Sequence, residues 1–231
     1  MKPHLYQIIA SATLILSGFS QTSADQEKPS PNILRILALP PRIEHPPLFL
    51  LQGEAAAIPL EIASSRLTGP YKVSPTNAWQ FALTATPTQP NGNIQLVASC
   101  KPAPSTDEQL VVLLRKPGKE MSYASFALDI KRSALNERQF LVVNLSPTEI
   151  AGDIGGARMA FPPGKPVTVS PKENLGPNLC HVAFLTSGPN GKWKPFFSTN
   201  WPLKDKIRGL VFFYQPPGSE KILIHTVSDF L

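Results

Sequence analysis

Histidine is the side chain that most often serves as a general base or binds a metal ion, and the chain has four. His4 lies in an apolar N-terminal segment, His181 in an apolar run and His225 near the C-terminus, while His45 follows Glu44 and precedes two prolines. No two histidines have the spacing of a local metal-binding pair. Glu44 and His45 could join a metal site only through ligands brought by the fold, and otherwise form an exposed loop pair.

Other catalytic patterns are missing from the sequence. It contains no Gly-x-Ser-x-Gly nucleophile motif and no phosphate-binding glycine loop ahead of a helix. The densest glycine cluster, residues 152–156, is expected to form a β-turn, and the 16 acidic residues show no pairing that predicts glycoside hydrolysis. We therefore predict a non-enzymatic protein with no cofactor and no metal.

The two cysteines, Cys100 and Cys180, are a candidate disulfide if the chain reaches an oxidising compartment. The bridge would close a loop of about 80 residues, which is worth about 4 kcal/mol by chain-entropy arguments. The alternative is two buried free thiols, since a chain of this length does not need a covalent bridge. Only His181 neighbours either cysteine, so neither is predicted to be a nucleophile.

The strongest candidates for binding are aromatic. Residues 192–202 combine Trp193, Phe196, Phe197 and Trp201 with lysines and small polar residues. If exposed, such rings stack on sugars or anchor a partner protein. The alternative is a core strand over 193–197 followed by a corner that Trp201 caps.

Residues 1–24 are predicted to be a cleavable signal peptide. Lys2 precedes an apolar stretch over 5–19, and Thr22-Ser23-Ala24 provides the small residues of a cleavage site ahead of a polar segment from Asp25. The apolar stretch is shorter than the roughly 20 residues that cross a bilayer. No cysteine follows Leu16-Ser17-Gly18, so no lipid anchor is expected. The mature chain is predicted to be exported, either periplasmic or secreted, with no membrane span.

The net charge is +6, and the lysines and arginines are scattered without a run of five. This pattern predicts a mildly basic, solvated surface and no nucleic-acid partner. The expected partner is a protein or glycan of the cell envelope.

The elements that would position these residues are strands, because 26 prolines leave almost no window for a long helix. Short apolar runs between them predict thirteen strands. These cover residues 33–39, 57–63, 78–84, 93–99, 109–115, 122–130, 139–145, 158–161, 166–169, 179–186, 193–197, 207–214 and 221–227.

Two kinds of strand are expected. Residues 79–84 alternate in the manner of a strand with one buried face, whereas 140–143 and 210–213 are continuously apolar, which indicates strands covered on both faces. Asn-Gly pairs at 91–92 and 190–191 predict hairpins. The spacing indicates an all-β, immunoglobulin-like antiparallel β-sandwich.

A polar, charge-rich stretch over 131–138 divides the mature chain into halves whose sequences do not align convincingly. We predict a flexible linker over 25–32, one β-sandwich lobe over 33–131 and a second over 132–231.

Two resemblances bear on the second half. The segment Phe140–Pro147, Gly155-Gly156, Pro162–Gly164 and Ser198–Leu203 resemble motifs of an uncharacterised group of exported bacterial β-sandwich proteins, which implies export and fold but no activity. Phe140–Pro147 is also partly similar to the motif of periplasmic pilus-assembly chaperones. Its Asn is displaced by one position and the Ile-Pro-Pro of that family is missing, so no cationic anchor residue is carried over.

The leading hypothesis is an exported binding or envelope-structural protein. A chaperone or assembly factor for exported subunits would instead need an uncovered edge strand beside an apolar groove. A carbohydrate-binding module would need Trp193 or Trp201 exposed on a flat face. A hydrolase would need a pocket with clustered histidines or carboxylates.

Overall fold

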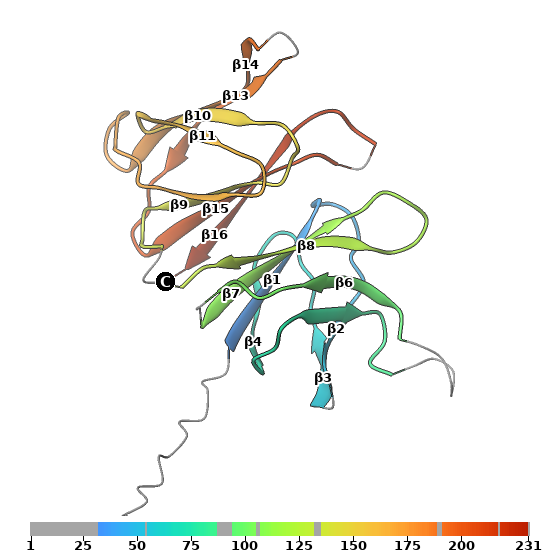
Figure 1. The fold of residues 1–231 in the computed structure, drawn as a ribbon. Coiled ribbons are helices and arrows are strands. Elements are labelled where there is room, and N and C mark those ends of the chain that lie inside the picture. Colours follow the sequence, from blue (N-terminus) through green and yellow to red (C-terminus); the bar gives the residue numbers. More distant parts are fainter. Residues whose placement is uncertain are drawn as a thin grey trace, which may run out of the picture.

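The computed structural model describes residues 32–53, 55–86, 94–104, 107–131, 135–188, 191–216 and 218–230. Over these ranges the chain forms sixteen strands and no helix (Figure 1), which confirms the all-β prediction. The predicted signal peptide, the linker up to residue 31 and the Asn-Gly pair at 91–92 lie outside the described residues. The strands are β1 Asn32–Leu39, β2 Leu48–Gln52, β3 Ala55–Leu60, β4 Thr68–Val73, β5 Trp79–Ala82, β6 Leu96–Cys100, β7 Glu108–Arg115, β8 Tyr123–Asp129, β9 Phe140–Asn144, β10 Ile150–Ile154, β11 Ala157–Phe161, β12 Pro166–Val169, β13 Leu179–Ser187, β14 Trp193–Pro202, β15 Ile207–Tyr214 and β16 Leu223–Phe230.

The strands form two tandem β-sandwich lobes with the same topology. In the N-lobe, β1 to β8, the sheets have the orders β4-β1-β7-β8 and β3-β2-β5-β6. In the C-lobe, β9 to β16, the orders are β12-β9-β15-β16 and β11-β10-β13-β14, so that adding eight to each N-lobe strand gives its C-lobe equivalent. Each lobe also has one parallel pair, β1 with β7 and β9 with β15. The structure therefore reveals a repeat that the two half-sequences did not.

All thirteen predicted strands are present, two of them (166–169 and 207–214) with the predicted ends and the others with shifted ends, and three further strands were missed. β2 is short and lies among prolines, and β4 contains Gly69-Pro70, which interrupts the strand pattern. β10 was interpreted as a turn because of its glycine, but Gly152 is in the strand and only Gly155 and Gly156 turn. A Cβ at Gly152 would lie 2.5 Å from the Phe184 ring, so this glycine makes room for a core aromatic.

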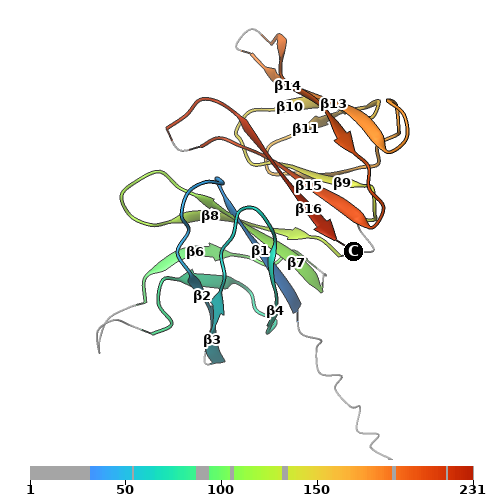
Figure 2. The same cartoon turned by 180° about the vertical axis from the view of Figure 1, so that it is seen from behind.

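The four sheets stack in layers (Figures 1 and 2). Three clusters of buried apolar residues lie among these layers in the described chain. One core lies inside each lobe, and the third lies between the lobes. Successive residues of β1, β7, β9 and β15 alternate between two cores, which confirms the prediction that 140–143 and 210–213 are covered on both faces. The inter-lobe core is built from Leu37, Leu39, Leu110 and Val112 of the N-lobe and Leu141, Val143, Leu210, Phe212 and Tyr214 of the C-lobe.

A buried charge network joins the lobes beside this core. Arg208 of β15 is 1% exposed, and its Nε and Nη2 both lie 2.7 Å from Oδ2 of Asp229 in β16. Arg35 of β1 is 3.1 Å from Glu108 of β7 and 3.7 Å from Asp229, which ties the N-lobe into the network.

Arg208 also fixes the crossing between the lobes. Its Nη1 donates to the backbone carbonyls of Ile130, at 2.6 Å, and Leu135, at 3.3 Å. These residues flank positions 132–134, where the predicted boundary lies, so one side chain holds both ends of the crossover.

We predict that Arg208→Met lowers the free energy of unfolding by about 3 kcal/mol, because it leaves the buried Asp229 carboxylate with only the longer contact to Arg35. Urea unfolding followed by tryptophan fluorescence measures this change. Arg158→Met is the matched control, because Arg158 is 89% exposed in its ion pair with Asp153. The control should change stability by no more than about 0.5 kcal/mol. A loss below about 1 kcal/mol for Arg208→Met would contradict the role assigned to the network.

A histidine makes a second polar contact between the lobes. Nε2 of His225 in β16 donates to the backbone carbonyl of Ser64 in the N-lobe at 2.5 Å. Burial lowers the pKa of His225, and the bond to Ser64 opposes that shift. Burial also lowers the pKa of His45, whose Nε2 donates to the Pro40 carbonyl at 3.1 Å and whose Nδ1 accepts from the Tyr123 hydroxyl at 3.2 Å.

Both lowered pKa values predict that the fold loses stability in mild acid. The unfolded chain binds protons near the ordinary histidine pKa of about 6.5, at which the folded chain still resists protonation. The free energy of unfolding should therefore fall between pH 7.5 and pH 5.5, as urea midpoints at several pH values would show. The double variant His45→Gln/His225→Gln should flatten this dependence; an unchanged slope would show that other groups cause it.

Candidate functional site

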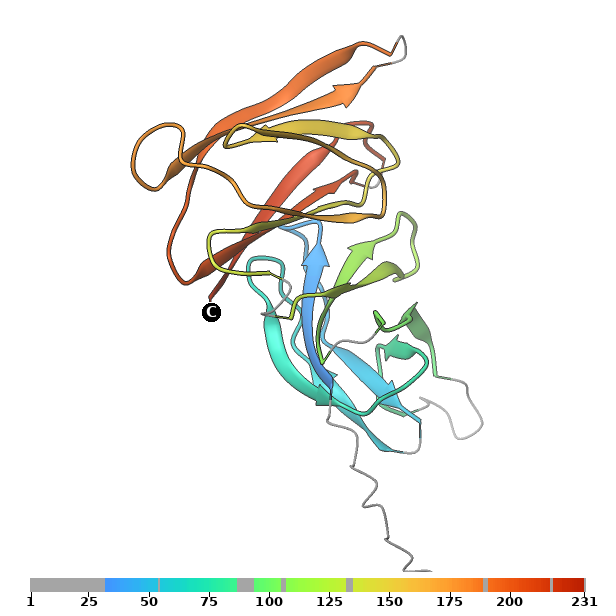
Figure 3. The ribbon, with the colours of Figure 1, turned by 60° about the vertical axis from the view of Figure 1, so that its left-hand side comes forward.

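The two outer strands on one side of the C-lobe, β14 and β16, do not close against each other. They are edge strands of facing sheets, and the space between them is called here the C-lobe slot. Figure 3 shows the orange β13–β14 hairpin and the red β15–β16 hairpin as two separate arms of this lobe. Two cavities follow the slot. One of about 220 Å³ lies between Trp201 and Ser228, and one of about 770 Å³ lies between Phe196 and Ile224 and reaches Pro40 of the N-lobe.

The equivalent side of the N-lobe is closed. There β6 lies against β8, and the Ser125 hydroxyl donates to the Ser99 carbonyl at 2.7 Å. Cys100 and Tyr123, on those two strands, are 5% and 3% exposed. In the C-lobe, by contrast, Thr226 and Ser228 of β16 are exposed. One topology therefore gives a sealed sandwich in the first lobe and an open one in the second.

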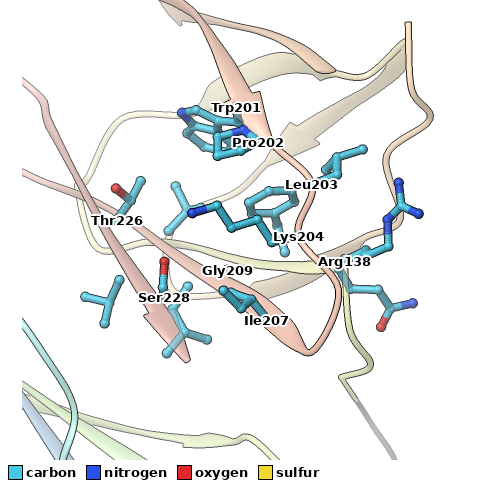
Figure 4. A pocket seen from close by; sticks show the side chains of 14 residues that line it. Arg138, Trp201, Pro202, Leu203, Lys204, Ile207, Gly209, Thr226 and Ser228 are labelled. Carbon is cyan, nitrogen blue, oxygen red and sulfur yellow. The ribbon is translucent and has the colours of Figure 1, made fainter. Parts of the chain in front are cut away.

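Aromatic rings line the inner wall of the slot. The Trp201 indole lies 5.0 Å from the Phe140 ring and 5.8 Å from the Phe184 ring, measured between centroids. The Phe140 ring lies directly on β15 at Gly209, where a Cβ would come within 2.2 Å of it. Glycine at 209 therefore makes room for the Phe140 ring, which lines the smaller cavity together with Trp201 and Ser228. Figure 4 shows Gly209, Trp201 and Ser228 around this cavity.

The structure separates the four predicted aromatic residues. Phe196, Phe197 and Trp201 are half-buried against the C-lobe core and line the slot. Trp193 is 43% exposed near the end of the β13–β14 hairpin, opposite Ser187. The alternative of a corner at Trp201 is wrong, because β14 continues to Pro202. Trp201 therefore serves both the core and the slot, and only Trp193 is exposed enough to be a sugar platform.

The hydrogen-bonding pattern identifies which backbone groups of β16 face the slot. On β15, the Gly209 amide donates to Gln139, and the Phe213 carbonyl accepts from Leu145, so residues 207, 209, 211 and 213 direct their backbone groups toward β9. The intervening residues therefore bond to β16, where directly opposed residues exchange both bonds. On β16 these are residues 223, 225, 227 and 229. Ile224, Thr226 and Ser228 are left to direct their N–H and C=O groups outward.

The two edges differ in their protection against strand addition. β14 carries Lys194, two prolines at 195 and 202, and an irregular register at Phe196, all devices that hinder pairing. β16 has no proline, glycine or lysine, and its register with β15 is unbroken over eight residue pairs. The sequence contained this signal, since 223–230 is a long strand without a breaker, but not the fact that the strand lies at an edge.

The slot is also positively charged. Arg42, Arg138 and Lys204 line the two cavities, and no aspartate or glutamate does so within the described chain. Arg138 is paired with Glu173 and lies 3.8 Å from Asp205. No carboxylate within ion-pair distance is found for Lys204 or Arg42 among the residues that the structure describes.

The cysteines do not form the candidate disulfide. Both are free and buried, Cys100 in the N-lobe core and Cys180 in the C-lobe core, so the inter-lobe layers separate them. Of the two alternatives, the structure has the two buried thiols. Burial raises the pKa of both, which keeps the thiols protonated and unreactive at neutral pH.

We predict that dithiodipyridine labels no thiol of the folded protein rapidly and labels two thiols after urea unfolding without reductant, because both sulfurs are shielded in separate cores. Absorbance of the released thiopyridone counts them. Unfolded protein that shows no reactive thiol until a reductant is added would contradict this arrangement.

The remaining chemical candidates stay apart. His45 is engaged in the N-lobe, His225 at the lobe interface and His181 with the Ser198 hydroxyl at 3.1 Å. Glu44 is exposed beside His45. Across the described ranges, no three His, Cys, Asp or Glu side chains gather in a way that could hold a metal ion.

No protein-family model matches the chain, and no curated protein matches it. Within the described residues, the structure contains no helix that is long and apolar enough to cross a membrane.

Proposed function

We propose that this protein is an exported, non-enzymatic assembly factor that binds an extended segment of a partner protein as an added strand on β16. The proposal depends mainly on one observation. β16 is a long, regular and unprotected edge beside a slot lined by aromatic rings, while the corresponding N-lobe edge is closed. An added strand would bond to the outward backbone groups of Ile224, Thr226 and Ser228. Such bonds give affinity, and the slot beside them gives selectivity.

The dimensions of the slot suit a short peptide segment. Residues 222 to 228 line it, and at about 3.3 Å per residue they span about 20 Å, the length of a seven-residue strand. The half-buried rings of Phe196, Phe197 and Trp201 would cover the inward side chains of that segment. These contacts favour a polypeptide over a glycan, because the Trp201 ring already packs against Phe140 and Phe184.

The resemblance to pilus-assembly chaperones supports the same class, namely exported two-lobe sandwiches that handle other exported chains. The proposed edge of this protein lies in the C-lobe, on the last strand. The role proposed here therefore rests on the slot and not on that family's motif.

The test places a photo-crosslinking residue, benzoylphenylalanine, at Ser228 and, as a control, at Lys72, which is exposed on the N-lobe edge strand β4. We expect light-dependent crosslinks in the native envelope from position 228 and none from 72. Mass spectrometry should map them to one extended segment of a partner.

Thr226→Pro, which deletes an outward N–H without removing a bond to β15, should abolish these crosslinks. Glu120→Pro, in an exposed N-lobe loop, is the proline control and should preserve them. If Thr226→Pro fails to fold, Thr226→Glu serves in its place, since a charged carboxylate on the slot face of an edge strand hinders addition and keeps the N–H. Crosslinks from 228 that survive both variants would overturn the proposal.

A further inference from the structure

We infer that the segment bound on β16 is acidic, with apolar side chains facing the centre of the slot and carboxylates facing its two ends. This inference rests on the proposed strand addition and specifies the chemistry of the partner. It follows from the distribution of charge along the slot and from the rings between the charged ends.

At one end of the slot the cation is Lys204. Figure 4 shows its side chain reaching across the pocket from the β14 side, beneath Trp201 and toward Thr226 and Ser228. A strand added to β16 would pass over this ammonium group. A carboxylate on the slot face of that strand would find an unpaired cation there, whereas a lysine would meet like charge in a partly desolvated space.

At the other end the cation is Arg42, on the N-lobe loop that borders the larger cavity together with Phe196 and Ile222. Arg42 has a left-handed backbone, with φ of 68°, and this conformation belongs to the turn that brings the loop to the slot. Lys204 lines the cavity beside Thr226 and Ser228, and Arg42 lines the cavity beside Ile222 and Ile224, so the two cations flank the slot-facing part of β16 at its two ends. The matching segment has the inverse pattern.

A second copy of this chain is a poor occupant of the slot. Two copies joined edge to edge through β16 would bring the cations of one slot close to those of the other, and each chain carries a net positive charge. Like charges placed opposite each other across a sheet disfavour pairing. An acidic partner segment removes that repulsion.

The test uses three fluorescein-labelled, N-acetylated seven-residue peptides and the full chain from Asp25. The first is Glu-Thr-Val-Thr-Val-Thr-Glu, whose glutamates and valines share one face of a strand. The second and third replace both glutamates by glutamine or by lysine. Fluorescence anisotropy measures binding of each peptide at low and high salt.

We expect the glutamate peptide to bind about tenfold more tightly than the glutamine peptide, as two partly exposed ion pairs of about 0.7 kcal/mol each would give, and the lysine peptide to bind most weakly. High salt should reduce the difference. Lys204→Gln and Arg42→Gln should each weaken the glutamate peptide and leave the glutamine peptide unchanged. Lys119→Gln, in an exposed N-lobe loop, should change neither.

Equal affinity for the glutamate and glutamine peptides would overturn the acidic preference and leave strand addition standing. No binding of any peptide, or binding that Thr226→Pro does not affect, would overturn strand addition itself. Sedimentation velocity provides the remaining outcome. Self-association that Thr226→Pro abolishes would show that the occupant is a second copy, and would overturn the inference.

Discussion

The division of β16 between two environments is the constraint on which the rest of the structure depends. His225, Val227 and Asp229 face the N-lobe. His225 bonds to Ser64, Val227 packs in the inter-lobe core, and Asp229 pairs with Arg35 and Arg208. The alternate residues Ile224, Thr226 and Ser228 face the slot. Because strand side chains alternate with a period of two, anchoring one set to the N-lobe necessarily presents the other set to the open side.

This anchoring explains how an edge strand can stay regular without a neighbour on its outer side. An isolated edge is held only by its ladder to one strand, and it frays or twists readily. Here the buried pair of Arg208 and Asp229 and the inter-lobe leucines hold the sheet on the face opposite the slot. The N-lobe therefore acts as the support that keeps the C-lobe edge in place, which gives the tandem arrangement a physical role.

The repeat also shows how one topology yields a closed and an open lobe. In the N-lobe, Trp79 of β5 lies opposite Cys100 of β6; in the C-lobe, Cys180 of β13 lies opposite Trp201 of β14. The tryptophan of this pair is therefore on the inner strand in the N-lobe and on the edge strand in the C-lobe. Trp79 is sealed at 1% exposure, whereas Trp201 lies at the slot, where it packs against Phe140. The exchange places a bulky aromatic at the edge that would otherwise close.

The sequence by itself determined the all-β class, the positions of most strands and the two-sided burial of 140–143 and 210–213, because each follows from local hydrophobic periodicity and from proline. It also singled out Phe196, Phe197 and Trp201. It missed β10, where Gly152 was interpreted as a turn although it makes room for Phe184, and it left the state of the cysteines open. Only the tertiary structure decided that Cys100 and Cys180 lie in separate cores, that the halves repeat one topology and that β16 is an edge. Whether a strand is central or peripheral depends on which distant segments pair with it, and the periodicity of 223–230 is the same in either place.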